Sequence, residues 1–410
     1  MLRNTLRSFR VWKNIERGAS DPILGLRENY IKDKHRKKSD LSVGVYRDNS
    51  GNAWVPEAVQ KARNQVVNQA YEDNIAGPDG FINSSLKLAL GDSRAIEENR
   101  IVNVQTPGAA GALHTLFNFI KHYLPQTPGV YFPVPSSFTH KLIAHELKFP
   151  IHNYTYYDPD KNKVKISEML RDLEMAKNKS VVVLQVCGHD PTGLDFSKED
   201  WSLIQDITAR KQHLALFVME QQGLVSGDPT EDSYPVRLFA EEGNPFALAQ
   251  SFSVNFGLYG ERVGSLTMNC GSGTEAEKLR SILLGMLDYI WGGNALFGAR
   301  VVEKVLRTPE LKREWETEVA EVAKSLLDRR NMLVDHLRYS GSLHNWSHLK
   351  HQKGLFSYTG MRPKHVLQAN KSHSVYLTLD GRINIGGINS NNVFHVAESI
   401  DEATRFTDSL

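Results

Sequence analysis

The segment Gln250–Gly264 reads QSFSVNFGLYGERVG. It continues the short apolar run Ala247–Gln250, which has the length and composition of a buried β-strand. Val254 stands near its centre, and a valine side chain has no nucleophile, no titratable proton and no hydrogen-bonding atom. No lysine occurs from Gln212 to Glu277, so no neighbouring amine is available to take a covalent role here.

Apolar runs that precede this segment predict an α/β protein. The strand-like runs are Gly129–Pro133, Val181–Val186, Leu214–Met219 and Ala247–Gln250. Between the second and third runs we expect a helix, because Ser197 and Asp200 have the spacing of a capping box. Its apolar face consists of Leu203, Ile204 and Ile207. Continuously apolar strands that alternate with helices indicate a mostly parallel sheet covered on both faces.

Helical periodicity predicts three further helices. Val55-Pro56 opens the first, and a stripe from Leu113 to Leu124 marks the second. Thr308-Pro309 is a favourable N-cap and N1 pair that begins a long third helix. The apolar side of this helix carries Leu311, Trp315, Val319, Val322, Leu326, Leu333 and Leu337. A long helix followed by a mixed region suggests a second domain, as the length of 410 residues also does.

Composition excludes several classes of protein. The 49 Lys and Arg against 47 Asp and Glu leave a net charge of +2, which gives no argument for nucleic-acid binding or general membrane attraction. The two cysteines, Cys187 and Cys270, cannot form a disulfide scaffold or a thiolate zinc site. No run of about 18 apolar residues occurs, so we expect no membrane span.

The first 20 residues differ from the rest of the chain. Four basic residues precede the first acid, Glu16, while Leu2, Leu6 and Phe9 have helical spacing. A basic, acid-poor, amphipathic N-terminus is typical of a mitochondrial transit peptide. The alternative is an exposed basic arm with no targeting role.

The segment Gln250–Gly264 closely resembles the cofactor-lysine segment of aspartate aminotransferases, and the resemblance runs from Asp21 to the C-terminus. Other stretches that carry it are Asp21–Leu26, Leu41–Asp48, His189–Gly193 and Asp380–Ile383, with Trp12 resembling the start of the mitochondrial form. It implies the fold-type I pyridoxal-phosphate architecture, with a large α/β domain over residues 55–307. Residues 21–54 with 308–410 would form a smaller α+β domain, after a targeting segment or arm over residues 1–20. Such homologues are homodimers with active sites at the subunit interface.

The resemblance also implies that the cofactor site has been dismantled. Val254 stands where the family has the lysine that binds pyridoxal phosphate covalently and moves the substrate proton. Val218 replaces the aspartate that pairs with the pyridinium nitrogen. Gln221 and Asp190 replace the tyrosine and asparagine that hydrogen-bond the phenolic oxygen, and Ser137 replaces the tryptophan that stacks on the ring. We therefore expect no catalytic residue and no bound cofactor.

The phosphate end is altered too. Gly108 and Ala110 lack the hydroxyl groups of the matching family positions, and the tyrosine from the other subunit aligns with Glu72 or, after a one-residue shift, Tyr71. A hydrogen bond to a charged group contributes about 1.5–3 kcal/mol, so losing three would cost roughly 5–9 kcal/mol, or three to six decades of affinity.

Two potential phosphate ligands remain at that end. They are Ser251 and Arg262, at opposite ends of the segment that carries Val254. In the alternative interpretation, Arg262 pairs with an acid of the protein or is retained for packing.

On the substrate side, Arg382 matches the arginine that binds the substrate α-carboxylate, and Gly44 lies in the early substrate loop. Asp288 occupies the position of the family arginine that reaches from the neighbouring subunit to bind the side-chain carboxylate of the substrate. In the alternative interpretation, the loop takes another course and Asp288 lies on a solvated face. His140 matches a family histidine, but without its usual acidic partner it is interpreted as a core residue. His189, with Asp190 and Glu220, has no recognised metal-ligand spacing, so no metal site is expected.

These observations favour a catalytically inactive relative of aspartate aminotransferases that serves as a structural or accessory subunit of a mitochondrial assembly, in the matrix or on the matrix face of the inner membrane. It would form a dimer with itself or with an active relative, and would contact other subunits of a large complex. Two alternatives stay open. One is a transaminase that uses pyridoxal phosphate non-covalently, and the other is a module that binds an amino or oxo acid through Arg382 and Gly44.

Overall fold

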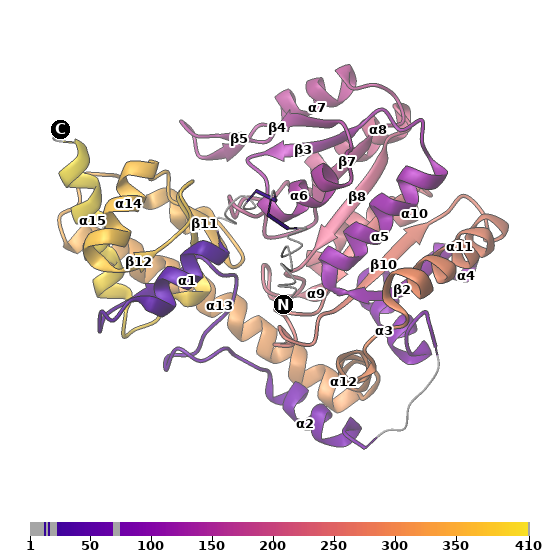
Figure 1. Ribbon diagram of the computed structural model, residues 1–410, viewed down its shortest axis with the longest axis horizontal. Helices are drawn as coiled ribbons and strands as arrows, with labels where there is room; N and C mark the ends of the chain where they lie inside the picture. Colours follow the sequence, from indigo (N-terminus) through magenta and orange to yellow (C-terminus); the bar gives the residue numbers. More distant parts are fainter. Residues whose placement is uncertain (1–11, 14, 17–22, 69–73, 409–410) are drawn as a thin grey trace, which may run out of the picture.

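A computed structural model describes residues 12–13, 15–16, 23–68 and 74–408 (Figure 1). Most of the basic segment 1–20 lies outside these residues, so its targeting role stays a prediction. The pair Tyr71 and Glu72 also lies outside the described residues.

Across the described residues, the main sheet has seven strands in the order β2-β10-β9-β8-β7-β3-β4. Their bounds are β2 Ile101–Pro107, β3 Val130–Val134, β4 Ile151–Thr155, β7 Val181–Gln185, β8 Leu214–Met219, β9 Phe246–Ser251 and β10 Val263–Asn269. Strand β10 runs antiparallel to both of its neighbours, and the other pairs are parallel. The prediction of a mostly parallel sheet is confirmed, and the four predicted strands match within one residue at each end.

Helices cover both faces of this sheet (Figure 1). They are α2 Glu57–Val66, α3 Asp79–Leu90, α4 Arg94–Glu97, α5 Gly108–Tyr123, α6 Phe138–Glu146, α7 Ile166–Met175, α8 Lys198–Arg210, α9 Pro229–Asp232, α10 Tyr234–Glu241, α11 Gly273–Trp291 and α12 Leu296–Arg307. Alternate strand residues reach opposite faces: Val181 and Val183 pack in the core beneath α5 and α11, whereas Val182 and Leu184 pack beneath α7, α8 and α10. Burial on both sides explains why these strands are apolar throughout.

The predicted starts of two helices agree with the structure in position, but only one of them has the expected side-chain capping bond. At α8, Ser197 and Asp200 form both hydrogen bonds of the capping box. At the long helix α13 (Pro309–Tyr339), Thr308 occupies the N-cap but its side chain makes no capping bond. Leu203 is 50% exposed, so its place on the apolar face of α8 was wrong.

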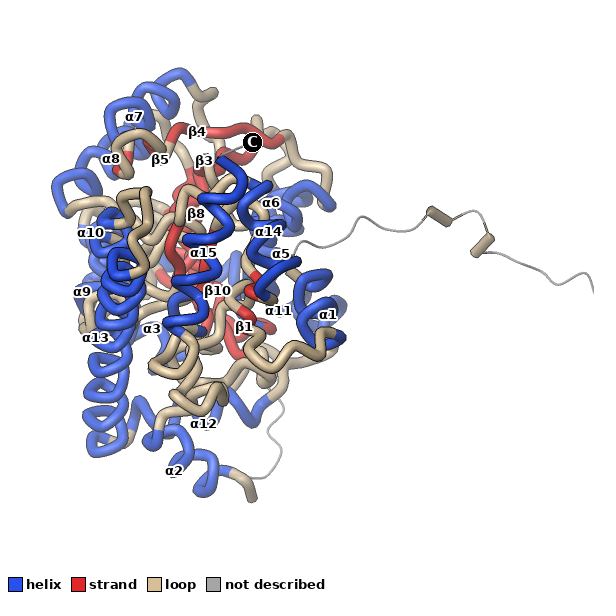
Figure 2. The backbone as a smooth tube through the Cα atoms, turned by 90° about the vertical axis from the view of Figure 1, so that its left-hand side faces the viewer, coloured by secondary structure: helices blue, strands red, loops and turns tan. Residues whose placement is uncertain are grey.

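The two ends of the chain meet in a separate cluster of elements around α13. These are α1 Leu24–Lys32, β1 Ser39–Asp40, β11 Phe356–Tyr358, α14 Pro363–His373, β12 Val375–Tyr376, β13 Arg382–Asn384 and α15 Val393–Asp408, with short 3-10 turns at Ser347–His351 and Ile385–Gly387. Strand β1 pairs in parallel with β12, and β11 pairs antiparallel with β13. Figure 2 shows α1, α14 and α15 together on the face toward the viewer. The proposed domain boundaries stay a prediction.

Two short strands, β5 Tyr157–Asp158 and β6 Lys163–Val164, form a small hairpin beyond β4. Among the helices that the structure describes, none is long and apolar enough to cross a membrane.

Candidate functional site

The residues singled out in the sequence gather at the carboxyl ends of the parallel strands, where ligand sites of α/β proteins usually lie. Asp190 follows β7, Gln221 follows β8, and Ser251 is the last residue of β9. Arg382 begins β13 and approaches from the C-terminal part of the chain.

Val254 lies in the turn after β9 and is partly buried against the core cluster around α13. Val218 lies in β8, is 2% exposed and packs in the core beneath α5. Neither position offers a polar atom to a ring, because both side chains are hydrocarbon. The two residues therefore belong to the apolar packing of the sheet and its edge.

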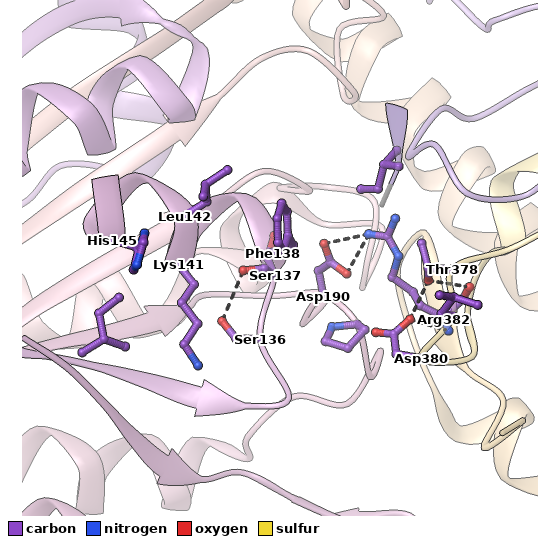
Figure 3. Close-up of a pocket in the computed structure, with 14 residues that line it drawn as sticks. Ser136, Ser137, Phe138, Lys141, Leu142, His145, Asp190, Thr378, Asp380 and Arg382 are labelled. Carbon is purple, nitrogen blue, oxygen red and sulfur yellow. Dashed lines mark hydrogen bonds and ion pairs between the residues drawn. The ribbon is translucent and has the colours of Figure 1, made fainter. Parts of the chain in front are cut away.

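Arg382 is already paired with a carboxylate of the protein (Figure 3). Its Nη1 lies 3.0 Å from both Oδ1 and Oδ2 of Asp190, and its Nη2 donates to the carbonyl oxygen of Ser42 at 2.6 Å. Both side chains are buried, with 7% of Arg382 and 11% of Asp190 exposed. Asp190 thus gives Arg382 the charge partner that the α-carboxylate of a substrate would provide.

Packing holds this guanidinium in place. Its central carbon lies 4.3 Å from the centroid of the Phe356 ring. The tip of this ring points at Gly44, where an added Cβ would lie 2.7 Å from Phe356 Cζ. Gly44 therefore allows the ring to support Arg382, which is a packing role in place of the predicted substrate contact.

Gln185 fixes Asp190 from its own strand. The Gln185 amide donates to the Asp190 carbonyl at 2.9 Å, and the Asp190 N–H donates to Gln185 Oε1 at 2.8 Å. No sequence pattern predicts this reciprocal pair, because the Gln185 amide lies on an otherwise apolar strand.

Both polar atoms of the Gln221 side chain are engaged within the protein. Its Nε2 donates to the Gly188 carbonyl at 2.8 Å, and its Oε1 accepts from the Leu355 N–H at 2.6 Å. The side chain is 4% exposed. It joins the loop after β7 to the segment before β11, which is a structural function.

His140 is buried, as expected of a core residue, but it does have an acidic partner, which corrects the expectation that none remains. Its Nε2 lies 3.3 Å from Glu220 Oε2, while its Nδ1 is buried without a hydrogen-bond partner among the described residues. Burial lowers the pKa of His140, but the hydrogen bond and charge of Glu220 outweigh it and the net shift is upward. Glu220 stands two residues after Val218, so the acid has moved along the same strand end.

The pKa of Glu220 is lowered overall. Burial raises it, while the hydrogen bond and charge of His140 and the nearby Arg262 and Arg382 lower it more. Glu220 therefore contributes a second negative charge within the site, beside Asp190.

Ser137 borders an open cavity. It is 9% exposed and begins α6, and its neighbour Ser136 also faces the cavity (Figure 3). The cavity has a volume of about 620 Å³, and its walls include Phe138, Leu142 and Arg382. A serine stands here where the resemblance places a stacking tryptophan, so the phenyl ring that borders the cavity comes from Phe138 and not from position 137.

The phosphate end is less altered than the ring end. Arg262 is exposed, and no hydrogen bond or ion pair joins it to another residue that the structure describes. Its guanidinium lies against Gly108, where an added Cβ would come within 2.7 Å of Nη2. The Ser251 hydroxyl accepts the Ser253 N–H at 3.3 Å. Direct pairing of Arg262 with an acid is absent among the described residues, although Glu220 lies close enough to interact with it electrostatically.

The remaining candidates lie apart from this site or face away from it. His189 stacks on Tyr156 with ring centroids 3.8 Å apart, and burial lowers its pKa to about 3. In the described part of the chain no group of three His, Cys, Asp or Glu side chains could hold a metal ion. Asp288 is exposed in the last turn of α11.

These observations do not fit the pyridoxal phosphate that the resemblance implies. The ring end offers hydrocarbon at Val254 and Val218, a buried amide that already bonds two backbone groups at Gln221, and a carboxylate already paired at Asp190. At the phosphate end, Arg262 is exposed and open to an anion.

Comparisons with known proteins agree with the fold. The family model "Aminotransferase class I and II" matches residues 36–400. The mitochondrial aspartate aminotransferase of Gallus gallus is 36% identical over 405 residues, covering 98% of this chain and 96% of that protein. The corresponding protein of Dictyostelium discoideum is 36% identical over 402 residues, covering 96% and 93%.

Among solved structures, the cytoplasmic aspartate aminotransferase of Saccharomyces cerevisiae superposes with a TM-score of 0.94 at 33% identity, covering 97% of this chain and 99% of that one. Family model, sequence relatives and structure thus agree over nearly the whole length. The chain belongs to the class I and II aminotransferase family and has the fold of its aspartate aminotransferases.

Proposed function

We propose that this chain is a catalytically inactive member of the family that serves as a structural or accessory subunit of a mitochondrial assembly. The observation that carries the proposal is Val254, a partly buried valine at the position of the Schiff-base lysine, in a segment without any lysine. Covalent catalysis by an amine requires that amine at the reacting carbon, and hydrocarbon cannot replace it.

The ion pair between Asp190 and Arg382 supports the same proposal from the substrate side. A substrate carboxylate would have to displace a buried internal carboxylate at 3.0 Å. The displaced Asp190 would then be left buried without its partner, which typically costs about 3–5 kcal/mol. This competition disfavours the alternative of an amino- or oxo-acid binding module.

The mitochondrial part of the proposal rests on two supports. The relatives in Gallus gallus and Dictyostelium discoideum are named as mitochondrial proteins, and residues 1–20 have the composition of a targeting segment. A chain that keeps the whole fold but not the catalytic groups can still bind other proteins through its surface. A dimer with itself or with an active relative is the simplest such assembly.

One observation favours a second candidate, a transaminase that holds pyridoxal phosphate without a covalent bond. Arg262 remains open to an anion beside Gly108. The missing ring contacts weigh against it, because Val218 leaves the pyridinium nitrogen without its charge partner.

Purification of the native protein with its associated chains tests the proposal. We expect no absorbance from bound pyridoxal phosphate, no aspartate or glutamate transamination above background after cofactor is added, and other mitochondrial chains in stoichiometric amounts. The Gallus gallus relative, treated in the same way, is the positive control for reconstitution. Stoichiometric cofactor with turnover would contradict the proposal and favour the second candidate.

A further inference from the structure

A second cavity, of about 560 Å³, lies between the turn after α1, the turn near Ser50 and the start of α15. These elements are on the left of Figure 1, apart from the seven-stranded sheet and the site at its strand ends. Four cationic residues line the cavity: Arg36, Lys37, Lys38 and Arg47. Among the described residues that line it, the only carboxylate is Asp40.

The turn that carries the basic residues is firmly held. Lys38 Nζ donates to the carbonyl oxygens of Tyr30 and Asp33, each at 2.7 Å, and lies over the Tyr30 ring. The Asp33 carboxylate accepts the His35 N–H at 2.8 Å and the Tyr376 hydroxyl at 2.8 Å. These bonds fix the backbone from residue 33 to residue 38, so that the side chains between are displayed from a defined position.

Two of the cations on this turn have no charge partner. Arg36 and Lys37 are exposed, and no hydrogen bond or ion pair of their side chains occurs among the described residues. The carboxylate of Asp40 is engaged through Oδ1 by the Ser42 N–H and hydroxyl. Arg47 donates to the Gly51 carbonyl at 3.0 Å with Nη1, and it too has no acidic partner among those residues.

Like charges gathered in one concavity repel each other, and a multivalent anion removes that repulsion. Guanidinium groups match the geometry of phosphate oxygens, and lysine adds a compact charge. The volume lies within the range of about 300–1,000 Å³ typical of small-molecule sites and exceeds what a lone phosphate needs. Phe394, 59% exposed, gives the cavity an apolar wall for the rest of a ligand.

We propose that this cavity binds a phosphate-bearing anion of at least two negative charges, supplied either by a free nucleotide or by the headgroup of an anionic lipid. Arg36, Lys37 and Arg47 would contact the phosphate oxygens, while Lys38 chiefly holds the turn. The proposal is independent of the inactivity of the former catalytic site, since the two sites share no lining residue.

The test uses the full chain with three probes: ATP, inorganic triphosphate, and phosphatidylcholine vesicles with and without phosphatidic acid. The double variant Arg36→Glu/Lys37→Glu is compared with Lys278→Glu/Arg280→Glu, which reverses two exposed charges on α11. Arg262→Gln removes the exposed cation at the phosphate end of the candidate site, so that binding of a probe there is recognised. Circular dichroism shows whether each variant is folded. The variant Arg36→Gln/Lys37→Gln removes the same two charges without reversing them, and it replaces the charge-reversed variant if that one does not fold.

We expect binding to weaken about a hundredfold in Arg36→Glu/Lys37→Glu, about tenfold for each charged contact, and to persist in the other two variants. If Arg36→Glu/Lys37→Glu loses binding of ATP and triphosphate, the ligand is a free phosphate compound. If it loses binding only of the vesicles that contain phosphatidic acid, the ligand is a lipid. Three outcomes would overturn the proposal. No probe binds saturably, or the α11 control loses as much binding as Arg36→Glu/Lys37→Glu, or only Arg262→Gln loses binding.

Discussion

At the scale of single residues, two basic groups of the candidate site have acidic partners within the protein. Asp190 pairs with Arg382, and Glu220 pairs with His140 and lies near Arg262. Arg382 and His140 therefore have their charge partners within the protein, whereas Arg262 has no direct acidic partner among the described residues. An anion that binds Arg382 must therefore compete with the internal carboxylate of Asp190.

Restoring the lysine alone should not restore activity. In Val254→Lys, transamination is expected to stay at background, because the ring-nitrogen partner and the stacking residue remain absent and catalytic groups act non-additively. Activity with added pyridoxal phosphate is the measurement. The combined variant Val254→Lys/Val218→Asp/Asp190→Asn/Gln221→Tyr is the comparison, and it should exceed the single variant. Robust turnover in the single variant would show that the pocket is less altered than we describe.

Freeing Arg382 should create carboxylate binding. Asp190→Asn removes the internal anion, so succinate should bind at least about tenfold more tightly than to the native chain, as one charged hydrogen bond allows. Calorimetric titration measures this. The double variant Asp190→Asn/Arg382→Met should lose the gain, and equal affinity of the native chain and Asp190→Asn would refute the blocking role of Asp190.

The pair His140–Glu220 should make stability depend on pH. The folded pKa of His140 is raised above its ordinary value of 6.5, so its contribution is fully present below that pH and is lost as pH rises through the folded pKa. The difference in unfolding free energy between the native chain and Glu220→Gln should therefore shrink with increasing pH. Urea unfolding at a series of pH values tests this, with Glu277→Gln on α11 as the control. A difference that grows with pH would contradict the assignment.

At the scale of elements, two helices that begin with similar sequence signals are stabilised differently. Ser197 and Asp200 exchange hydrogen bonds at the start of α8, whereas Thr308 at the start of α13 makes no side-chain capping bond. Helix α13 instead relies on a buried stripe that includes Trp315, whose indole N–H donates to the Asn255 carbonyl at 2.8 Å. Packing along 31 residues is sufficient without a cap.

This difference predicts unequal costs for matched substitutions. Ser197→Ala should lower the free energy of unfolding by about 1 kcal/mol, because an N-cap hydrogen bond is lost. Thr308→Ala should change it by well under about 0.5 kcal/mol, as substitutions away from such features usually do. Urea midpoints of the two variants give the comparison. Equal destabilisation would mean that Thr308 caps α13 in solution.

At the scale of the whole molecule, the chain keeps the scaffold of its family over nearly its whole length. The superposition on the yeast enzyme covers 97% of the chain with a TM-score of 0.94. Interfaces between subunits need not contain a cofactor-binding atom, so they can outlast the catalytic groups.

We therefore expect the chain to form a stable dimer, with itself or with an active relative. Sedimentation at micromolar concentration, or native mass measurement of the complex, decides the question. Obligate interfaces often leave no stable folded monomer, so a dissociated yet well-folded monomer would contradict the prediction. A single copy bound to unrelated subunits would show that the old interface now serves other partners.

Local sequence determined the α/β class, four strands to within one residue, and the absence of an amine at Val254, because each depends on the periodicity or identity of adjacent residues. The tertiary structure alone decided that Asp190 meets Arg382 across 192 residues, that Glu220 becomes the partner of His140, and that the basic turn near Arg36 faces α15. The periodicity of one element specifies its buried face. Which distant side chain meets a given charge is set only when the elements pack together, since the pairing depends on distances that no short stretch of sequence contains.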